Sequence, residues 1–197
     1  MGKDSKGVGH TLCMKYSIVF TEYDPDGVNL SMSHASLKSI LENTKENFEI
    51  VHVRDASSYT SAINEGLTRA IGEYIVFVSN DIFLQETQWL TKFTREGIGG
   101  WRFLPFYLTN ELRPDFSCWS ISRNAFNEMG LMDTSYEEGM YFEDDDYIYT
   151  ARQKNIPLFN AEIRLEHLEG QTLNKLFPKR NEMIKHNREI FRKKWNV

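Results

Sequence analysis

The sequence predicts an α/β fold in a single domain with a mostly parallel central sheet. Two observations carry this prediction. Apolar strand-like runs alternate with amphipathic helical segments in the first part of the chain, and no Pro-, Gly- or Ser-rich linker divides its 197 residues. That length is ordinary for one domain with a sizeable core. Aromatic residues make up 13% of the chain, which excludes a disordered or fibrous protein.

The first half of the chain has the order strand, helix, strand, helix, strand. Runs of β-branched and aromatic residues predict strands at residues 16–21, 48–53 and 74–78. Between them, apolar residues at helical spacing predict helices at residues 32–41 and 62–71, and Gly72 is expected to end the second. This order indicates a parallel sheet with right-handed crossovers, whose ligands bind beyond the carboxyl ends of the strands.

The second half is expected to add strands that carry aromatic residues and three further helices. The expected strands are residues 100–107, 117–122 and 157–166. The expected helices are residues 123–129, ended by Gly130, then 143–154 and 178–195. One stripe of the last helix is apolar and is expected to pack on the domain: Met183, Ile184, Ile190, Phe191 and Trp195.

Charge divides the chain into an acidic body and a basic end. Residues 171–197 hold eight basic residues against Glu182 and Glu189, a net +6, so the remainder carries −11 of the total of −5. We expect residues 1–14 to be a disordered lead-in, 15–170 the domain, and 171–197 a basic amphipathic helix packed on it. The charges are either a solvated helix face or a contact with an anionic surface.

Nothing in the sequence indicates secretion or a membrane span. The longest apolar runs are too short to cross a bilayer, and the first ten residues contain no apolar signal region. The two cysteines, Cys13 and Cys118, are too few for a disulfide framework. We therefore expect a cytoplasmic protein without a transmembrane segment.

Three features are candidates for chemistry. Asp81 directly follows the apolar run at residues 74–78, where a carboxylate faces the ligand crevice and is suited to a divalent cation, although Asn-Asp is also ordinary turn chemistry. His167 follows an expected strand and precedes Gly170, so it is either a structural histidine or part of a site. The third is the run Phe142-Glu-Asp-Asp-Asp146.

Four adjacent carboxylates repel one another, so the run at residues 143–146 needs a compensating cation, a helix N-terminus or a functional reason. A helix N-terminus accounts for one or two acidic residues but not for four. A carboxylate at this place is suited to act as general base on an acceptor hydroxyl.

In their order along the chain these features resemble the family 2 glycosyltransferases with the GT-A fold. Six segments carry the resemblance: residues 17–24, residues 54–57, residues 63–81 with their Asp-x-Asp-like end, residues 122–133, the Glu-Asp motif at residues 142–146, and His167. Two positions depart from the family pattern. Ser79 stands where the family has the first Asp of Asp-x-Asp, and Arg54 stands where it has an acidic residue.

The resemblance implies a single Rossmann-like GT-A domain and an inverting transfer from a nucleotide-sugar, with a UDP-sugar as the expected donor. It places a divalent metal, Mn²⁺ or Mg²⁺, on Asp81 and His167, and makes Asp144 the preferred base, followed by Asp145 and Glu143. It also implies that the donor is bound by Thr21, Tyr23, Asp55, Asn64 and Asn80. In this interpretation Tyr23 stacks on the nucleobase and Asp55 accepts its imide N–H.

The acceptor is less defined by the sequence. Five aromatic residues either form an acceptor platform or belong to the core: Trp101, Phe103, Phe106, Tyr107 and Trp119. We rank a glycan or lipid-linked acceptor first and a hydroxymethylated DNA base second. The competing hypothesis is a catalytically inactive nucleotide-sugar binding module, motivated by Ser79 and Arg54. A nucleotidyltransferase usually needs a glycine-rich phosphate loop, and none follows the first strand.

Overall fold

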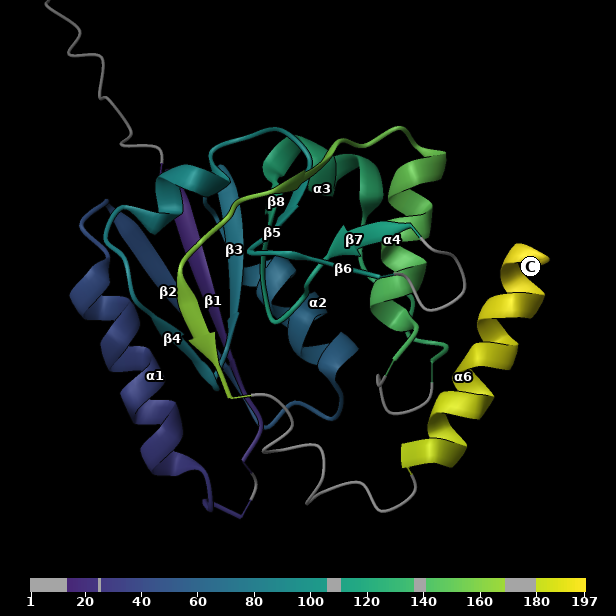
Figure 1. Ribbon diagram of the computed structural model, residues 1–197, viewed down its shortest axis with the longest axis horizontal. Coiled ribbons are helices and arrows are strands. Elements are labelled where there is room, and N and C mark those ends of the chain that lie inside the picture. Colours follow the sequence, from purple (N-terminus) through teal and green to yellow (C-terminus); the bar gives the residue numbers. More distant parts are fainter. Residues whose placement is uncertain (1–13, 25, 106–110, 137–140, 169–179) are drawn as a thin grey trace, which may run out of the picture.

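The computed structural model describes residues 14–24, 26–105, 111–136, 141–168 and 180–197 and shows an α/β fold around a mostly parallel sheet (Figure 1). In spatial order the six strands of this sheet are β2 (Phe48–Arg54), β1 (Tyr16–Glu22), β3 (Tyr74–Ser79), β8 (Cys118–Ser122), β5 (Ile98–Gly100) and β9 (Leu158–Asn160). Only β8 runs against the others, since it pairs antiparallel with both β3 and β5. The predicted fold class is confirmed.

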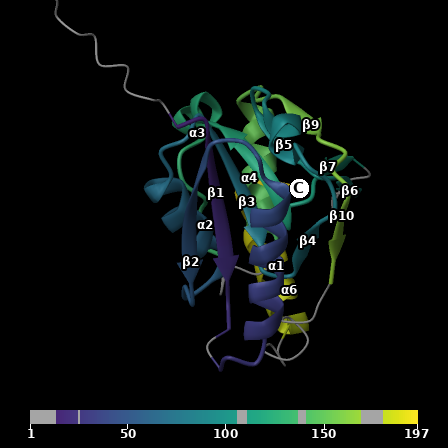
Figure 2. The same ribbon diagram turned by 90° about the vertical axis from the view of Figure 1, so that its left-hand side faces the viewer.

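Helices cover both faces of the sheet. They are α1 (Leu30–Asn43), α2 (Tyr59–Arg69), α3 (Arg123–Met129), α4 (Glu143–Gln153), α6 (Arg180–Trp195) and the 3₁₀ helix η1 (Trp89–Phe93). One face lies under α1, and the other under α2 and α4, with α6 outside α4 (Figures 1 and 2). In the described part of the chain, no helix is both long enough and apolar enough to cross a membrane.

The strand sequences follow from this double cover. Successive residues of a strand point to opposite faces, so a strand covered on both sides is apolar throughout. In β1, Ile18 and Phe20 join the core on the α1 side with Ile40, while Val19 joins the core on the α2 side with Leu67. The strands and helices predicted for residues 16–78 are confirmed within a few residues.

Helix α2 lies unusually close to the sheet. A Cβ atom on Gly66 would stand 2.4 Å from Cγ1 of Val19, so only glycine permits this approach. The helix ends at Arg69, and the prediction that Gly72 ends it is wrong. Ala70 is already extended, because the chain at Gly72 must pass close to the backbone of Ser17 in β1.

Two predicted strands of the second half are wrong. Residues 100–107 do not form one strand, because the chain leaves the central sheet after Gly100, where it crosses Pro114 closely. It continues as β6 (Phe103–Pro105), which pairs with β7 (Leu112–Pro114) in a separate two-stranded sheet.

The predicted strand at residues 157–166 is likewise divided into β9 and β10 (Leu165–His167). The break follows Asn160, whose side-chain oxygen accepts the N–H of Glu162 at 3.0 Å, and Glu162 has a positive φ of 52°. β10 pairs antiparallel with β4 (Ile82–Leu84). His167 is therefore the last residue of this strand, next to the residues that follow β3.

The C-terminal helix packs through its predicted apolar stripe. Phe191 and Met183 are buried, and Ile184, Ile190 and Trp195 pack partly buried against the same core, which confirms the stripe. Phe191 lies 5.8 Å from Phe142, measured between ring centroids. The expected disordered lead-in at residues 1–14 and the helix start at residue 178 fall almost wholly outside the described residues.

Candidate functional site

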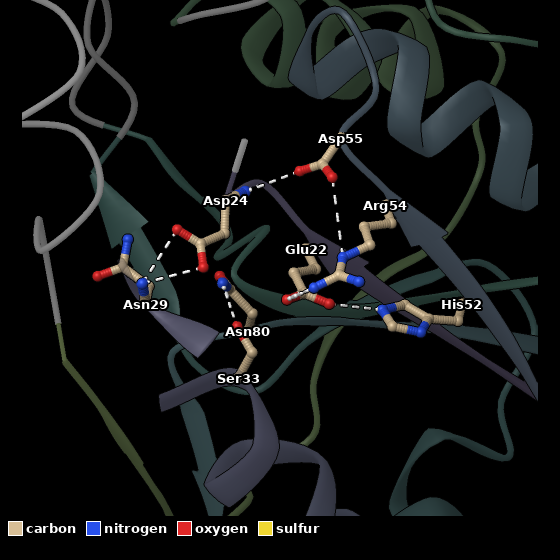
Figure 3. A network of polar contacts seen from close by, with 8 residues as sticks. All are labelled: Glu22, Asp24, Asn29, Ser33, His52, Arg54, Asp55 and Asn80. Carbon is tan, nitrogen blue, oxygen red and sulfur yellow. Dashed lines mark hydrogen bonds and ion pairs between the residues drawn. The ribbon is translucent and has the colours of Figure 1, made fainter. Parts of the chain in front are cut away.

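The carboxyl ends of β1 and β2 meet in a polar network (Figure 3). Asp24, just after β1, accepts the N–H of Asn29 with both carboxylate oxygens, at 3.0 and 2.9 Å, and so fixes the start of α1. The N–H of Asp24 donates to Oδ1 of Asp55 at 3.0 Å. Asp55 follows β2 with a φ of 51°, a conformation that Asp tolerates better than most residues. Asp55, the residue predicted to bind the nucleobase, is therefore held against the end of β1 by this hydrogen bond.

Arg54 is tied to its neighbours. Its Nη2 lies 3.2 Å from Oε1 of the buried Glu22, and its Nε lies 3.8 Å from Oδ2 of Asp55. His52 contacts the other oxygen of Glu22 at 2.8 Å. The arginine at a position where the resemblance expects an acidic residue thus balances two carboxylates of this edge.

The other predicted donor residues have different surroundings. Thr21 is half-buried and lies opposite Ser79 in the pairing of β1 with β3, and Tyr23 is 36% exposed just beyond β1. Asn80 is buried and donates to Oγ of Ser33 at 2.9 Å. These three remain beside the strand ends where the sequence predicts a donor.

The side chain of Asn64 is instead bonded to the chain that follows α3. Its Nδ2 donates to the carbonyl of Met132 at 3.0 Å, and its Oδ1 accepts the N–H of the same residue at 2.8 Å. It fastens the chain after α3 to the side of α2. Among the described residues, the side-chain hydrogen bonds of Asn64 therefore join it to Met132 and not to the strand ends.

Asp81 and His167, the two residues that the resemblance assigns to a metal, lie close together. Oδ2 of Asp81 lies 3.4 Å from Nε2 of His167, and the carbonyl of Asp81 accepts the N–H of Leu168 at 3.1 Å. Within the described ranges, no group of three or more His, Cys, Asp or Glu side chains is arranged to hold a metal ion.

Two protein ligands nevertheless fit the metal that the resemblance implies. Mg²⁺ and similar ions in nucleotide sites take one or two protein ligands and fill the remaining positions with phosphate oxygens and water. With metal–ligand bonds of about 2.1 Å, adjacent ligands of an octahedral ion lie about 3 Å apart. The spacing of Asp81 and His167 is close to this value.

The acidic run forms the first turn of α4, and a buried arginine compensates it. Nη2 of Arg113, in β7, lies 2.8 Å from Oδ2 of Asp144, and its Nε lies 2.6 Å from Oδ1 of Asp145. The Asp144 side chain is 17% exposed, whereas that of Asp145 is fully buried and Glu143 is also buried. Of the three predicted bases, Asp144 is therefore the most accessible to an acceptor.

Burial and mutual repulsion raise the pKa of two carboxylates of this turn. Burial, followed by the charge of Asp144, raises the pKa of Glu143 well above its usual value. The same two causes raise the pKa of Asp145 to about 7, although Arg113 acts in the opposite direction. Glu143 and Asp145, on either side of Asp144, therefore take up protons at a higher pH than ordinary carboxylates do.

Asp146 is a structural member of the run. Its carboxylate accepts hydrogen bonds from the hydroxyl of Tyr136 at 2.9 Å, from Nζ of Lys194 at 2.9 Å and from Nε1 of Trp195 at 2.7 Å. It joins α4 to α6 and to the chain after α3, which explains one of the four carboxylates without a catalytic role.

Short contacts connect the acidic turn to the strand ends. Burial, and after it the charges of Asp144 and Glu143, raises the pKa of Tyr59 at the start of α2, so these carboxylates lie near the exit of β2. The N–H of Ser79 donates to the carbonyl of Ser117 at 3.0 Å, and Ser117 in turn donates to Asp115, two residues after Arg113. The chain that carries Arg113, the partner of Asp144, therefore passes the end of β3 that leads to Asp81.

The predicted aromatic platform is only partly compatible with the structure. Trp119 is fully buried and stacks between Phe77, at 4.5 Å, and Phe116, at 4.1 Å, so a role for it in acceptor binding is wrong. Trp101 and Phe103 are half-buried beside the site. Phe106 and Tyr107 lie outside the described residues.

Comparison with known proteins relates part of this chain to a family and the whole arrangement to a fold. Residues 29–95, from α1 to just beyond η1, match the model of a glycosyltransferase-like family. A crystal structure of GalNAc-T7 with UDP, GalNAc and Mn²⁺ matches with a TM-score of 0.55 at 12% identity, covering 80% of this chain and 44% of the other. The chain has the GT-A fold of glycosyltransferases.

Two further structures share the GT-A fold. The mannosyltransferase PcManGT from Pyrobaculum calidifontis, in complex with GDP-Man and Mn²⁺, matches with a TM-score of 0.56 at 12% identity over 76% of this chain and 55% of the other. A glycosyltransferase involved in glycosylating the major capsid of PBCV-1 matches with a TM-score of 0.51 at 8% identity, over 89% of this chain and 99% of the other. The chain thus spans about half the length of GalNAc-T7 and PcManGT. No curated protein sequence matches it.

Proposed function

We propose that the protein is a metal-dependent inverting glycosyltransferase that moves a sugar from a nucleotide-sugar to an acceptor hydroxyl. The observation that supports the proposal is the link from Asp144 through Arg113, Asp115 and Ser117 to the end of β3, which precedes Asp81. A partly open carboxylate beside a metal-compatible pair is the arrangement that a single-displacement transfer requires. The GT-A fold supports the same activity.

On the donor side, Asp55 and Tyr23 are proposed to bind the nucleobase, with Thr21 and Asn80 lining the site. A carboxylate accepts the imide N–H of uracil, so we propose a UDP-sugar, and the UDP in the GalNAc-T7 structure supports this choice. Asp81 and His167 would hold a Mn²⁺ or Mg²⁺ ion, which when bound neutralises negative charge on the leaving diphosphate.

On the acceptor side, Asp144 takes the proton of the attacking hydroxyl as its oxygen bonds to the anomeric carbon. The bond from that carbon to the diphosphate oxygen breaks on the opposite face, so the configuration inverts. Sugar transfer passes through a transition state with oxocarbenium character, by analogy with hydrolysis. We propose a glycan or lipid-linked acceptor, because the GT-A neighbours act on sugars.

A panel of UDP- and GDP-sugars, assayed with and without Mn²⁺, tests the proposal. Asp144→Asn is expected to bind UDP as the unaltered protein does and to lose roughly 10²–10⁴-fold in transfer rate, the usual contribution of a general base. Asp81→Ala is expected to lose the Mn²⁺-dependent part of UDP affinity in calorimetry. Glu128→Gln, an exposed carboxylate of α3, is the matched control and should change neither.

The competing interpretation is a binding module without turnover. It is favoured by Ser79, which stands where the resemblance expects an acidic residue. UDP binding by the unaltered protein, together with no release of nucleotide from any donor of the panel, would exclude the transferase.

A further inference from the structure

Arg113 is a buried cation in contact with two of the predicted bases. Its side chain is 7% exposed, and its Nη2 and Nε atoms point to different carboxylates, those of Asp144 and Asp145. Its Nη1 donates to the carbonyl of Pro114 at 3.1 Å, whereas the approach of Nε to Asp145 is an ion pair without hydrogen-bond geometry. A guanidinium held in this way presents a fixed fork, which a lysine does not reproduce.

Asp144 is held from two directions. Its Oδ2 pairs with Arg113, and its Oδ1 accepts the N–H of Asp145 at 2.8 Å. An ionised carboxylate has about four acceptor positions on its two oxygens, so two contacts leave others for a hydroxyl. The orientation of Asp144 is thus set by the protein before an acceptor arrives.

Acidic and titratable groups surround Asp144. Glu143 and Asp145 flank it on its own helix, Asp115 lies beyond the arginine, and Tyr59 faces the turn from α2. Arg113 is the cation that contacts the carboxylate of Asp144 among the described residues, and Arg152 acts on Asp145 from the last turn of α4. Losing Arg113 would remove the cation that contacts Asp144 and Asp145.

We propose that Arg113 is a positioning residue that orients Asp144 for proton abstraction. The inference rests on the proposed function, because it assigns Arg113 a role through the proposed base. It also gives β7, which lies outside the central sheet, a part in the chemistry of α4.

The test is the transfer kinetics of Arg113→Met at a fixed pH. A base that is no longer oriented should lower kcat by up to about 10²-fold with little change in KM for the nucleotide-sugar. A second readout is the titration of Asp145 followed by ¹³C NMR, with Asp145→Asn used to assign the signal, because Arg113 lowers the pKa of Asp145 and its removal should raise that midpoint. Arg123→Met, which removes an arginine bonded to the carbonyls of Ala70 and Gly72, should change neither kcat nor the midpoint.

Arg113→Lys keeps the test decisive if Arg113→Met fails to fold. One ammonium group cannot serve both carboxylates in the same way, so kcat should fall and the midpoint of Asp145 should rise. An unchanged kcat or an unchanged Asp145 midpoint in a folded Arg113 variant would overturn the proposal. The NMR titration needs no substrate, so a shifted Asp145 midpoint with no transfer from any donor would refute the proposed function while leaving the pairing established.

Discussion

Four carboxylates stand side by side at the start of α4, and their surroundings give them different roles. Asp146 bonds to Tyr136 and to α6, and Asp145 is buried beside Arg113. Glu143 is also buried, whereas the side chain of Asp144 is partly exposed. Adjacent residues of one helical turn point in different directions around its axis. Four similar carboxylates in the sequence therefore have different environments in the folded chain.

The burial of Asp145 predicts a pH-dependent stability. An unfolded aspartate titrates near pH 4, whereas the pKa of Asp145 in the folded chain is about 7. Between these values the folded state binds more protons, so the free energy of unfolding should fall as the pH rises from about 4 to 7. Urea denaturation at several pH values should show this fall, and Asp145→Asn should reduce it.

Glu143 acts in the same direction, so some slope should remain in Asp145→Asn. An identical pH dependence in the variant and in the unaltered protein would show that Asp145 does not carry the extra proton.

Sequence reasoning identified the acidic turn, the Asp81–His167 pair and the strand-end residues, because each has a local signal. It did not identify Arg113. The density of carboxylates predicted that a compensating cation or a helix N-terminus was needed, but nothing local to β7 connects an arginine thirty residues earlier to that need. A contact of this kind depends on how the chain folds back, which composition and periodicity do not report.

At the scale of elements, the first half of the chain was predictable, as were the helices of the second half and the strand β8, whereas two strands of the second half were not. Strands covered on both faces, such as β1 and β3, produce apolar runs that no surface strand imitates. The departures at Gly100 and after Asn160 depend on close crossings and on a turn, so the apolar character continues while the strand does not. A bend interrupts the hydrogen-bond pairing of a strand, but it leaves the apolar pattern of the side chains unchanged.

The close approach of α2 to β1 predicts a destabilising Gly66→Ala. Alanine in a helix interior normally gains about 0.5–1 kcal/mol over glycine. The new methyl group, however, would lie 2.4 Å from Val19 and 3.0 Å from Phe77, and overpacking of this kind costs about 1–3 kcal/mol. We expect a net loss of stability in chemical denaturation.

A double variant separates the clash from other effects. Val19→Ala removes the contacting methyl groups, so Gly66→Ala should be far better tolerated in that background. Purely additive effects of the two substitutions would contradict the proposed close contact.

At the scale of the whole molecule, α6 attaches residues 180–195 to α4, whose first turn holds the proposed base. Phe191 packs on Phe142 and Tyr149, while Lys194 bonds to Asp133 and Asp146. Its apolar stripe was predicted from periodicity, but the attachment of Lys194 was not. One basic residue of this helix is therefore structural, not part of a solvated face.

Phe191→Ala should destabilise the whole domain. Phe191 is fully buried, and removing a buried phenylalanine side chain costs about 3–5 kcal/mol. Lys193→Glu, at an exposed position of the same helix, should change the free energy of unfolding by no more than about 0.5 kcal/mol. Thermal and urea unfolding measure both, and a small effect of Phe191→Ala would show that α6 contributes little to the domain.

The pair of strands β6 and β7 has an evolutionary consequence. It is inserted between β5 and β8, which pair directly with each other, so an exchange of this insertion leaves the ladder of the central sheet intact. Such a position is open to rapid divergence, and an engineer would choose it for a loop graft. The presence of Arg113 inside the insertion makes that divergence conditional, since a replacement segment must bring its own cation to the same register or lose the partner of Asp144.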